Sequence, residues 1–459
     1  MRSQRERTAK TSGRVDKPSQ KDRKKRPAKK NVKRPPDAAA VLAQDNGVLD
    51  ETDSEQLLAR DASLGYNPNY DQPAFTAFAS VDVATPVERL NLNWRERDLP
   101  ERIRTKHVHR LHPYLGKFIP QVVEIFLRKY SPRRVYDPFC GSGTTLVEAS
   151  ILGIDSVGCD ISPFNCLLSR VKTACYDVRA VEEEIRSILR EFNSMVRKTH
   201  QPSLFGDLPL RTTDNEYLRA WFHPVALSEL LSFRELIPNY RHQDLLKVIL
   251  SRAARSSRLT THFDLDFPKR PQTEPYQCYK HGRVCTPTKS AAKFVNRYCF
   301  DTMARIKEYA SLRSTELPAA VVKEGDSRNV KLPRIDMVLT SPPYVGLIDY
   351  HEQHRYAYEL LGLSREAEPK EIGPANRGVS QRARDEYVSD IEEVFRHAMK
   401  NMLSGGVLVV VVGDRRNLYN GIAARLGVQV EHIIKRHVNR RTGRRSGDFY
   451  ENVLVWRKG

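Results

Sequence analysis

Short apolar runs and helical spacings alternate along two parts of this chain. Seven stretches have strand patterns, and two of them contain the apolar runs Met337–Leu339 and Val407–Val412, as in strands buried on both faces of a sheet. The seven stretches are residues 134–137, 156–160, 319–322, 335–339, 407–412, 428–438 and 452–456. Apolar positions recur at helical spacing at 121–130, from about 144, at 385–402 and at 419–426. This order predicts an α/β fold with a mostly parallel sheet.

Between these two parts, residues 176–317 lose the alternation and are predicted to form a mainly helical insertion. Amphipathic helical patterns occur at 218–236, 244–256 and 291–312. The intervening stretch 257–290 is loop-like and interleaves basic residues with Tyr276 and Tyr279. Such residues suit contact with nucleic acid, but a helical subdomain that packs its aromatic side chains inward would have the same pattern.

The positive charge is concentrated at the beginning of the chain. Residues 1–36 contain fifteen Lys and Arg against three Asp and Glu, within a formal net charge of +20 for the whole chain. This segment is predicted to be a disordered basic tail, and 37–95 a linker or N-terminal extension. The tail suits a polyanionic partner because phosphate neutralisation releases counterions, although a solubilising tail would look the same. The sequence has neither a secretory-signal pattern nor an apolar run of about 18 residues that would predict a membrane span.

Cysteine usage indicates a reducing compartment. The seven cysteines are scattered and odd in number, which is typical of free thiols in a cytoplasmic protein. Cys278 and Cys285 flank His281 and are the only cluster in the sequence that suggests a metal site. A tetrahedral zinc site needs four ligands and usually has closer cysteines, so ordinary thiols and no metal are expected.

The stretch Asp336–Tyr344 takes a predicted buried strand directly into a stiff corner. Ser341-Pro342-Pro343-Tyr344 follows the apolar run, and its two prolines hold the backbone extended and prevent a helix from starting. The corner therefore presents a hydroxyl, carbonyl acceptors and one aromatic ring at the carboxyl end of a strand. Ligands bind at this edge of open α/β sheets.

A second motif has the features of a nucleotide-binding unit. The strand at 134–137 leads into Gly141-Ser142-Gly143 and a helix from about Thr144, and the next strand ends at Asp160. Glycines let the backbone approach a ligand closely, and a helix N-terminus offers free amides. Asp160 follows Gly141 by 19 residues, close to the spacing at which an acid reaches ribose hydroxyls. A purely structural role is the alternative for this acid.

Together these motifs resemble the S-adenosylmethionine-dependent DNA amino-methyltransferases, which methylate exocyclic nitrogens of cytosine or adenine. Asp137-Pro138-Phe139-Cys140-Gly141-Ser142-Gly143-Thr144 resembles the family's cofactor loop, and Ser341–Tyr344 its catalytic tetrapeptide. His112–Pro120 is similar to the segment that precedes the cofactor loop in sheet-permuted members. The resemblance implies a Rossmann-like seven-stranded sheet, mostly parallel with an antiparallel last strand, in a catalytic domain formed by 96–175 and 318–459.

The resemblance also implies roles for individual residues. Ser341, Pro342, Pro343 and Tyr344 are the expected catalytic residues, with acceptors for the target amine on Ser341 and a prolyl carbonyl, and a stacking face on Tyr344. S-adenosylmethionine is the expected cofactor, with its ribose at Asp160 and its adenine near Asp326, for which a turn or helix cap is the alternative. The expected cofactor-binding residues are Lys117, Phe118, Asp137, Phe139, Gly141, Ser142, Gly143, Thr144, Asp160 and Asp326.

Three segments are expected to approach DNA. Strand 428–438 is expected to run parallel to its neighbours, which would place its exit loop at the ligand edge of the sheet. The phosphate-binding residues expected in that loop are Arg440, Arg441, Arg444 and Arg445. The segment 363–384 is expected to close over the substrate, and the insertion 176–317 is the candidate for target recognition by position alone.

The first residue of the tetrapeptide bears on the methylated atom. Family members with serine there mostly methylate N4 of cytosine, whereas Asp or Asn usually indicates N6 of adenine. The expected activity is therefore N4-cytosine methylation of a flipped base in a specific sequence of double-stranded DNA, by a restriction–modification or related enzyme in the cytoplasm of a prokaryote, associated with its nucleoid. N6-adenine methylation, an RNA base methyltransferase, and a non-catalytic nucleic-acid-binding protein with the same fold are the alternatives.

Overall fold

One mostly parallel sheet organises the described part of the molecule. The computed structural model describes residues 76–94, 98–200, 209–262, 264–265, 268–313, 320–438 and 449–459. All of them belong to one compact unit, Leu57–Gly459. The predicted tail 1–36 and most of the predicted linker 37–95 lie outside the described residues.

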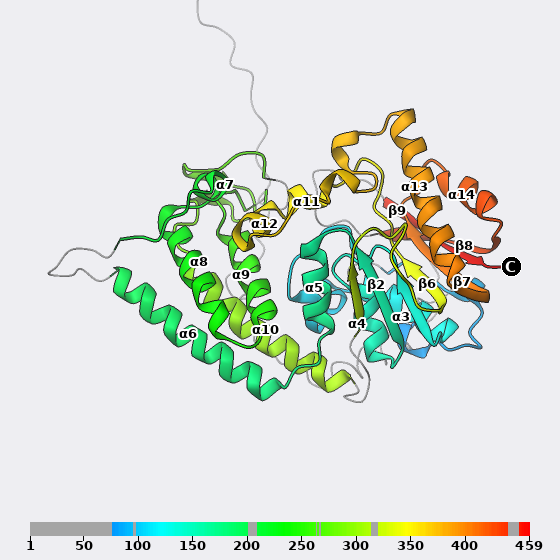
Figure 1. The fold of residues 1–459 in the computed structure, drawn as a ribbon, viewed down its shortest axis with the longest axis horizontal. Helices are drawn as coiled ribbons and strands as arrows, with labels where there is room; N and C mark the ends of the chain where they lie inside the picture. The colour runs from blue at the N-terminus through cyan, green and yellow to red at the C-terminus, as the bar shows by residue number, and fades with distance from the viewer. Residues whose placement is uncertain are drawn as a thin grey trace, which may run out of the picture. The chain divides into compact units, whose positions relative to one another are not determined.

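Seven strands of the described residues form the sheet, in the order β5-β2-β1-β6-β7-β9-β8 (Figure 1). They are β1 (Arg134–Asp137), β2 (Asp155–Asp160), β5 (Val321–Glu324), β6 (Ile335–Thr340), β7 (Met402–Val412), β8 (Gln429–Val438) and β9 (Phe449–Arg457). Neighbours from β5 to β7 pair in parallel, whereas β9 is antiparallel to both β7 and β8. The predicted fold class, including the antiparallel last strand, is therefore confirmed.

The prediction that strand β8 runs parallel to its neighbours is wrong. In the described sheet β8 lies at the edge and hydrogen-bonds to β9 alone, and this pairing is antiparallel. The last strand, β9, lies between β7 and β8. Because β9 is antiparallel to β7 as well, β8 still points in the direction of the parallel strands, and its carboxyl end lies at the edge where they end.

Consecutive strand residues enter separate cores, because alternate side chains point to opposite faces of a sheet. Leu408 packs with helices α13 and α14 on one face, whereas Val409 packs with helices α3 and α4 on the other. The four helices are α3 (Pro120–Tyr130), α4 (Thr144–Ile151), α13 (Gln381–Lys400) and α14 (Leu418–Leu426). Both strand residues are completely buried, as expected for a parallel sheet covered on both sides.

The stretch predicted as an insertion is mainly helical, and its helices share one hydrophobic core. They are α6 (Val178–His200), α7 (Glu216–Trp221), α8 (Pro224–Leu236), α9 (Gln243–Ser257) and α10 (Ala292–Leu312). The single helix predicted over 218–236 is two helices, because Pro224 starts α8 and His223 caps it by accepting from the Val225 amide. Helices α5 (Pro163–Thr173) and α12 (Arg355–Leu361) complete this core, and α5 joins it to strands β2 and β5 of the sheet (Figure 1).

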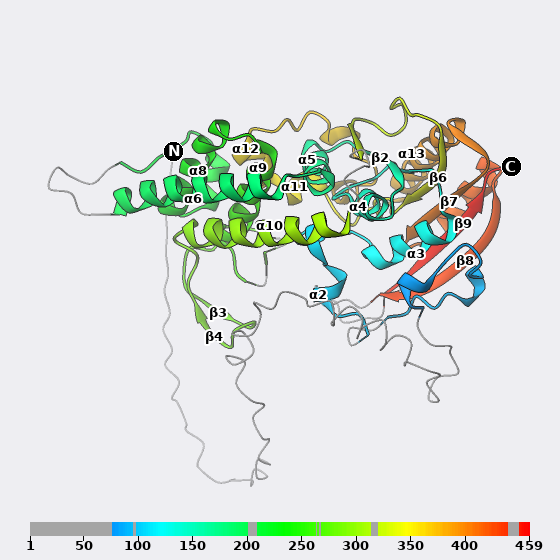
Figure 2. The same ribbon diagram turned by 90° about the horizontal axis from the view of Figure 1, so that it is seen from below.

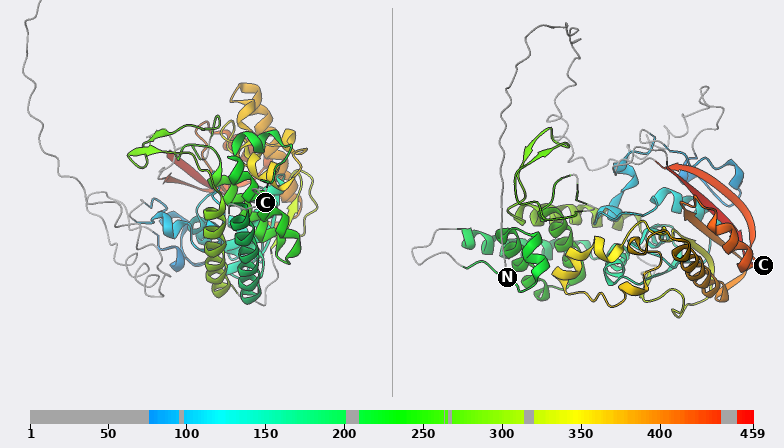
Figure 3. Two further views of the ribbon diagram at one scale, coloured as in Figure 1. Left: turned by 90° about the vertical axis from the view of Figure 1, so that its left-hand side faces the viewer. Right: turned by 90° about the horizontal axis from the view of Figure 1, so that it is seen from above.

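A small hairpin occupies part of the stretch predicted to be loop. Its strands are β3 (Tyr276–Cys278) and β4 (Arg283–Cys285), and it stands out from the helices (Figures 2 and 3). The remaining short helical elements are η1 (Phe78–Ser80), η2 (Val87–Arg89), α2 (Glu101–Arg104), η3 (His107–Arg110), η4 (Ile237–Asn239), α11 (Tyr350–Gln353), η5 (Glu368–Lys370) and η6 (Ala375–Arg377). Among the described helices, none combines the length and apolar character that a membrane span requires.

Candidate active site

A cavity lies beyond the carboxyl ends of β1, β2, β5 and β6. Its wall combines the turns that follow these strands with the segment before α3 and the segment after the Ser-Pro-Pro-Tyr corner. Gly141 and Ser341 both line it, although 200 residues separate them in the chain. The predicted convergence of the glycine turn and the corner at one edge of the sheet is therefore confirmed.

Asp137 ends strand β1 and holds the floor of this edge together. Its carboxylate is buried and accepts hydrogen bonds from the Thr340 hydroxyl (2.6 Å), the Thr145 hydroxyl (2.7 Å) and the Phe139 amide (3.1 Å). These contacts connect β1 to the end of β6 and to α4. Burial raises the pKa of the Asp137 carboxyl to about 6, although the three hydrogen bonds oppose the shift.

The glycine turn adopts left-handed backbone conformations that bring α4 and α5 close together. Gly141 has φ +49° and Gly143 has φ +81°. A Cβ on Gly143 would lie 2.9 Å from the Ser169 hydroxyl oxygen, and that hydroxyl donates to the Gly141 carbonyl (2.9 Å). The glycine at 143 is thus required by helix packing, in addition to any approach to a ligand.

Asp160, at the end of β2, lines the cavity and organises the neighbouring backbone. One carboxylate oxygen accepts from the Gly141 amide (2.9 Å), and the other accepts from the Ser162 amide (2.9 Å) and the Asn165 side-chain amide (3.0 Å). Burial raises the pKa of the Asp160 carboxyl, and these hydrogen bonds lower it by less.

Asp326 follows β5 and also lines the cavity. Its carboxylate forms a bidentate ion pair with Arg328 (Nη2–Oδ2 2.7 Å, Nε–Oδ1 2.9 Å), and Arg328 also binds Asp390 (2.6 Å). Burial raises the pKa of Asp326, but the Arg328 hydrogen bonds and charge outweigh burial and hold the pKa below its ordinary value. This acid is ionised and fixed in orientation.

The Ser-Pro-Pro-Tyr corner presents Ser341 and Pro343 to the cavity. The Pro343 carbonyl already accepts a hydrogen bond from the Tyr387 hydroxyl (2.9 Å). Tyr344 donates its hydroxyl to Glu451 Oε1 on β9 (2.9 Å), and Glu451 Oε2 binds Arg436 on β8 (3.0 Å). The antiparallel pair β8–β9 therefore anchors the aromatic ring of the corner.

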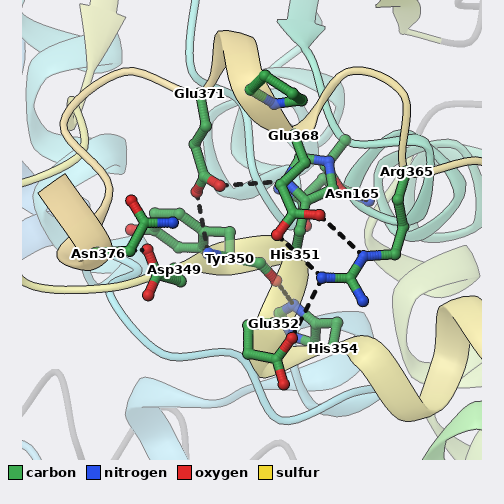
Figure 4. Close-up of polar contacts among 12 residues, drawn as sticks. Asn165, Asp349, Tyr350, His351, Glu352, His354, Arg365, Glu368, Glu371 and Asn376 are labelled. Carbon is green, nitrogen blue, oxygen red and sulfur yellow. Dashed lines mark hydrogen bonds and ion pairs between the residues drawn. The ribbon is translucent and has the colours of Figure 1, made fainter.

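Another part of the cavity wall comes from the segment after the corner. The sequence pattern predicted only some of the residues in it. Glu371 lines the cavity and accepts from the Tyr350 amide (2.9 Å), and its second oxygen lies 3.1 Å from His351 Nδ1 (Figure 4). The Tyr350 ring stacks on Tyr114, with centroids 5.9 Å apart. Glu371 falls in the predicted covering segment 363–384. Tyr114 lies in the segment His112–Pro120 that the resemblance singled out, but no local pattern marked Tyr350 or His351, which join the wall only in the folded chain.

The comparisons with known proteins agree with this geometry. A family model described as DNA methylase matches residues 112–170. The chain is 34% identical over 433 residues to the type II methyltransferase M.MjaII of Methanocaldococcus jannaschii, covering 78% of this chain and 81% of that protein. It is 24% identical over 281 residues to the type II methyltransferase M.MvaI of Kocuria varians (57% and 59% covered). It is 25% identical over 334 residues to the type II methyltransferase M.BsoBI of Geobacillus stearothermophilus (65% and 62% covered).

The chain belongs to the N4/N6-type family of DNA amino-methyltransferases. S-adenosylmethionine is accordingly the methyl donor and DNA the substrate of the methyltransferase. The residues of the cavity wall fit such a donor, because three of them, Ser142, Asn165 and His351, have a buried polar atom (Oγ, Oδ1 and Nε2) with no hydrogen-bond partner within the described residues. Unpaired buried polar groups are costly, and a ligand with polar groups of its own would supply partners for them.

The methyltransferase brings together most, but not all, of the residues that the sequence singled out. The predicted residues that line the cavity are Lys117, Phe118, Phe139, Gly141, Ser142, Thr144, Asp160, Asp326, Ser341 and Pro343. The predicted residues that are not among those lining the cavity are Asp137, Gly143, Pro342 and Tyr344, and each of them is next in the chain to a lining residue. The predicted arginines Arg440, Arg441, Arg444 and Arg445 lie outside the described residues.

Lys117 is the predicted wall residue with the most unusual environment. Its amine donates to the His109 carbonyl (3.1 Å), and burial lowers its pKa to about 8. A carboxylate close to this amine, such as that of the methionine part of S-adenosylmethionine, would raise the pKa again.

Proposed function

We propose that the methyltransferase modifies N4 of cytosine in a specific sequence of double-stranded DNA, with the base flipped into the cavity. The observation that supports this choice is Ser341, which lines the same cavity as Gly141 and Asp160. In the family that the chain resembles, serine at this position is typical of cytosine enzymes. Relatives named type II methyltransferases support a role in restriction–modification.

The chemistry required of the corner follows from the target amine. An exocyclic amine is a poor nucleophile because its lone pair is delocalised into the ring. When bound, S-adenosylmethionine supplies an electrophilic methyl group on a sulfonium. Acceptors aimed at the amine hydrogens localise the lone pair on nitrogen, and prolines suit such a position because they present carbonyls and no amide donors. Catalysis is then mainly a matter of position and electrostatics.

One hydrogen bond of the corner supports a particular choice of acceptors. The Pro343 carbonyl is engaged by Tyr387, so we propose that the Ser341 hydroxyl and the Pro342 carbonyl accept from the two amine hydrogens. Tyr344 would support the flipped base with one face of its ring, held in place through Glu451. After the transfer, the extra proton of the methylated nitrogen leaves to solvent.

The other wall residues are proposed to hold the donor. Asp160 would accept from ribose hydroxyls, since it lies in the wall at the end of β2. Asp326 would accept from the adenine amino group, because Arg328 keeps it ionised. Ser142 and Asn165, whose buried oxygens lack partners in the described chain, would contact the remaining polar groups of the donor.

The test is methyl transfer to defined substrates by the full-length protein. Duplex DNA and structured RNA are incubated separately with radiolabelled S-adenosylmethionine, and methylated DNA is then mapped at base resolution. The proposal predicts label in DNA, and N4-methylcytosine in one sequence context. Label in RNA alone, or N6-methyladenine as the product, would show that the proposal is wrong.

Ser341→Ala tests the catalytic corner itself. Loss of one acceptor is expected to lower kcat by about 100-fold, the usual cost of removing one electrostatic contact to a transition state. Affinity for S-adenosylmethionine is expected to stay within about 3-fold, because the hydroxyl faces the amine. Ser404→Ala, an exposed position near the start of β7, is the matched control. An equal loss of cofactor affinity would place Ser341 in donor binding instead.

A further inference from the structure

We propose that the hairpin β3–β4 binds a structural zinc ion through His262, Cys278, His281 and Cys285. The ligand atoms of these four side chains all lie within 4.8 Å of one another. Two come from the hairpin strands, one from its turn and one from the loop after α9. The cluster lies on the hairpin that stands out from the helices (Figures 2 and 3), away from the residues that line the catalytic cavity.

The separations match those of a tetrahedral Cys₂His₂ site. Cys278 Sγ lies 3.5 Å from His262 Nδ1 and 3.6 Å from His281 Nδ1, and His281 Nδ1 lies 3.4 Å from Cys285 Sγ. Zn–S and Zn–N bonds of normal length at a tetrahedral angle separate sulfur from nitrogen by roughly 3.6 Å. One ion can therefore bind all four ligands with little rearrangement. Two thiolates and two neutral imidazoles would also balance its charge.

Burial of the two thiols has no other structural cause within the described residues. Cys278 and Cys285 are 3% and 8% exposed, yet neither belongs to any of the hydrophobic cores there. Their hairpin neighbours Tyr279 and Val284 are 90% and 63% exposed. Strands of three residues do not form a stable hairpin alone. A structural metal supplies the stability that a core would otherwise provide.

The local backbone suits a metal-binding turn. The amides of His281 and Gly282 both donate to the Cys278 carbonyl (3.3 and 2.8 Å), which folds the chain so that Cys278 and His281 lie side by side. Gly282 has φ +63°, a conformation that glycine adopts without strain. His262 completes the set from sixteen residues before Cys278. The hairpin by itself contains only three ligands, which is why the sequence favoured ordinary thiols.

One contact must change when the ion binds. The Tyr276 hydroxyl lies 3.0 Å from His262 Nδ1 and also accepts from the His262 amide. The Tyr276 hydroxyl keeps the second contact when the imidazole nitrogen turns to the metal.

A different buried cluster, His107, His109 and Glu148, also meets the distance requirement. There, however, the Lys106 amine already pairs with Glu148 (3.0 Å), so a cation is in place.

The test is metal content of the full-length protein purified under reducing conditions without chelator or added metal. Inductively coupled plasma mass spectrometry is expected to find about one zinc per chain. Cys278→Ser combined with Cys285→Ser is expected to lower this to below about a tenth, whereas Cys175→Ser, an exposed cysteine outside the cluster, should keep it. Far-UV circular dichroism and S-adenosylmethionine binding check that the double variant still folds.

Cobalt substitution gives an independent signal. Co²⁺ added to metal-free wild-type protein should produce the visible absorption of a tetrahedral ion with thiolate ligands, and zinc should displace it. If the double variant does not fold, His281→Asn, an exposed position, is expected to weaken cobalt binding at least 10-fold, as loss of one ligand should. Wild-type protein that holds no zinc and gives no cobalt absorption, or a disulfide between Cys278 and Cys285, would overturn the proposal.

Discussion

Asp137 illustrates how a single residue acts on the site through the backbone it holds. The acid was expected around the cofactor, but its oxygens are engaged by Thr340, Thr145 and the Phe139 amide. It therefore fixes the distance between the end of β1 and the end of β6. The cost is a buried carboxylate, and burial raises its pKa.

This environment predicts a pH dependence of stability. The folded-state pKa of about 6 lies above the ordinary value of 3.8, so the folded protein binds this proton more tightly than the unfolded chain does. The free energy of unfolding should therefore fall as pH rises from about 4 through about 6, by about 3 kcal/mol from this group. Urea unfolding at several pH values measures the slope.

Asp137→Asn is the control for that slope. The side-chain oxygen of Asn can still accept from Thr340 and Phe139, and the Thr145 hydroxyl can donate to the Leu339 carbonyl, 3.2 Å away. The variant should be less sensitive to pH in this window. Identical pH slopes for the variant and the wild type would show that the carboxyl does not titrate there.

At the scale of elements, the glycine turn lets α4 pack closely against α5. Gly143→Ala should destabilise the fold by about 2 kcal/mol or more, because a left-handed backbone and a collision with Ser169 are combined at one position. The same change should weaken S-adenosylmethionine binding, since Ser142 and Thr144 line the cavity. Unfolding free energies and isothermal titration measure the two effects.

Gly427→Ala is the matched control for Gly143→Ala. Gly427 ends α14 with φ +67°, but an added Cβ there would meet nothing within 4 Å. The Gly427→Ala variant should lose only the part of the stability that comes from the left-handed backbone, about 1 kcal/mol of the free energy of unfolding. Its affinity for S-adenosylmethionine should not change. Equal losses of stability in the two variants would mean that contact between α4 and α5 contributes nothing.

The pair β8–β9 supports the Ser-Pro-Pro-Tyr corner, because Tyr344 donates its hydroxyl to Glu451 on β9. Glu451→Gln leaves Arg436, of which only 5% is exposed, without its charged partner, and should destabilise the protein by about 3 kcal/mol. Tyr344 can still donate to the new side chain, so we expect kcat of the folded variant to stay close to that of the wild type. Adding Arg436→Met should recover part of the loss in urea unfolding. If the double variant has a lower free energy of unfolding than Glu451→Gln alone, this account is contradicted.

At the scale of the whole molecule, DNA affinity should depend on the loop after β8. Its arginines lie outside the described residues, but β8 ends at the same edge of the sheet as the parallel strands, where the cavity lies. Replacing Arg440, Arg441, Arg444 and Arg445 by Ala should weaken DNA binding and reduce the slope of log Kd against log salt by roughly 0.9 for each phosphate that the protein no longer neutralises. S-adenosylmethionine affinity should not change.

The matched control for the loop is Arg396→Ala. Arg396 lies on α13, where it pairs with Glu392 (2.6 Å). Fluorescence anisotropy over a range of salt concentrations compares the variants. An unchanged salt slope in the loop variant would show that its arginines do not contact phosphate.

The sequence by itself determined the seven strands of the main sheet, the glycine turn and the proline corner. Each depends on local causes: apolar periodicity for the strands, glycine for positive φ at 141 and 143, and proline for the extended backbone at 342–343. The convergence of the two motifs also followed, because parallel strands place their carboxyl ends at one edge.

Only the tertiary structure decided which groups meet across the chain. It inserted β9 beside β7, engaged the Pro343 carbonyl with Tyr387, placed Glu371 in the cavity wall and brought His262 to the hairpin thiols. None of these partners has a local signal. The physical reason is that a side chain's hydrogen bonds and ligands depend on three-dimensional proximity, which periodicity along the chain does not encode.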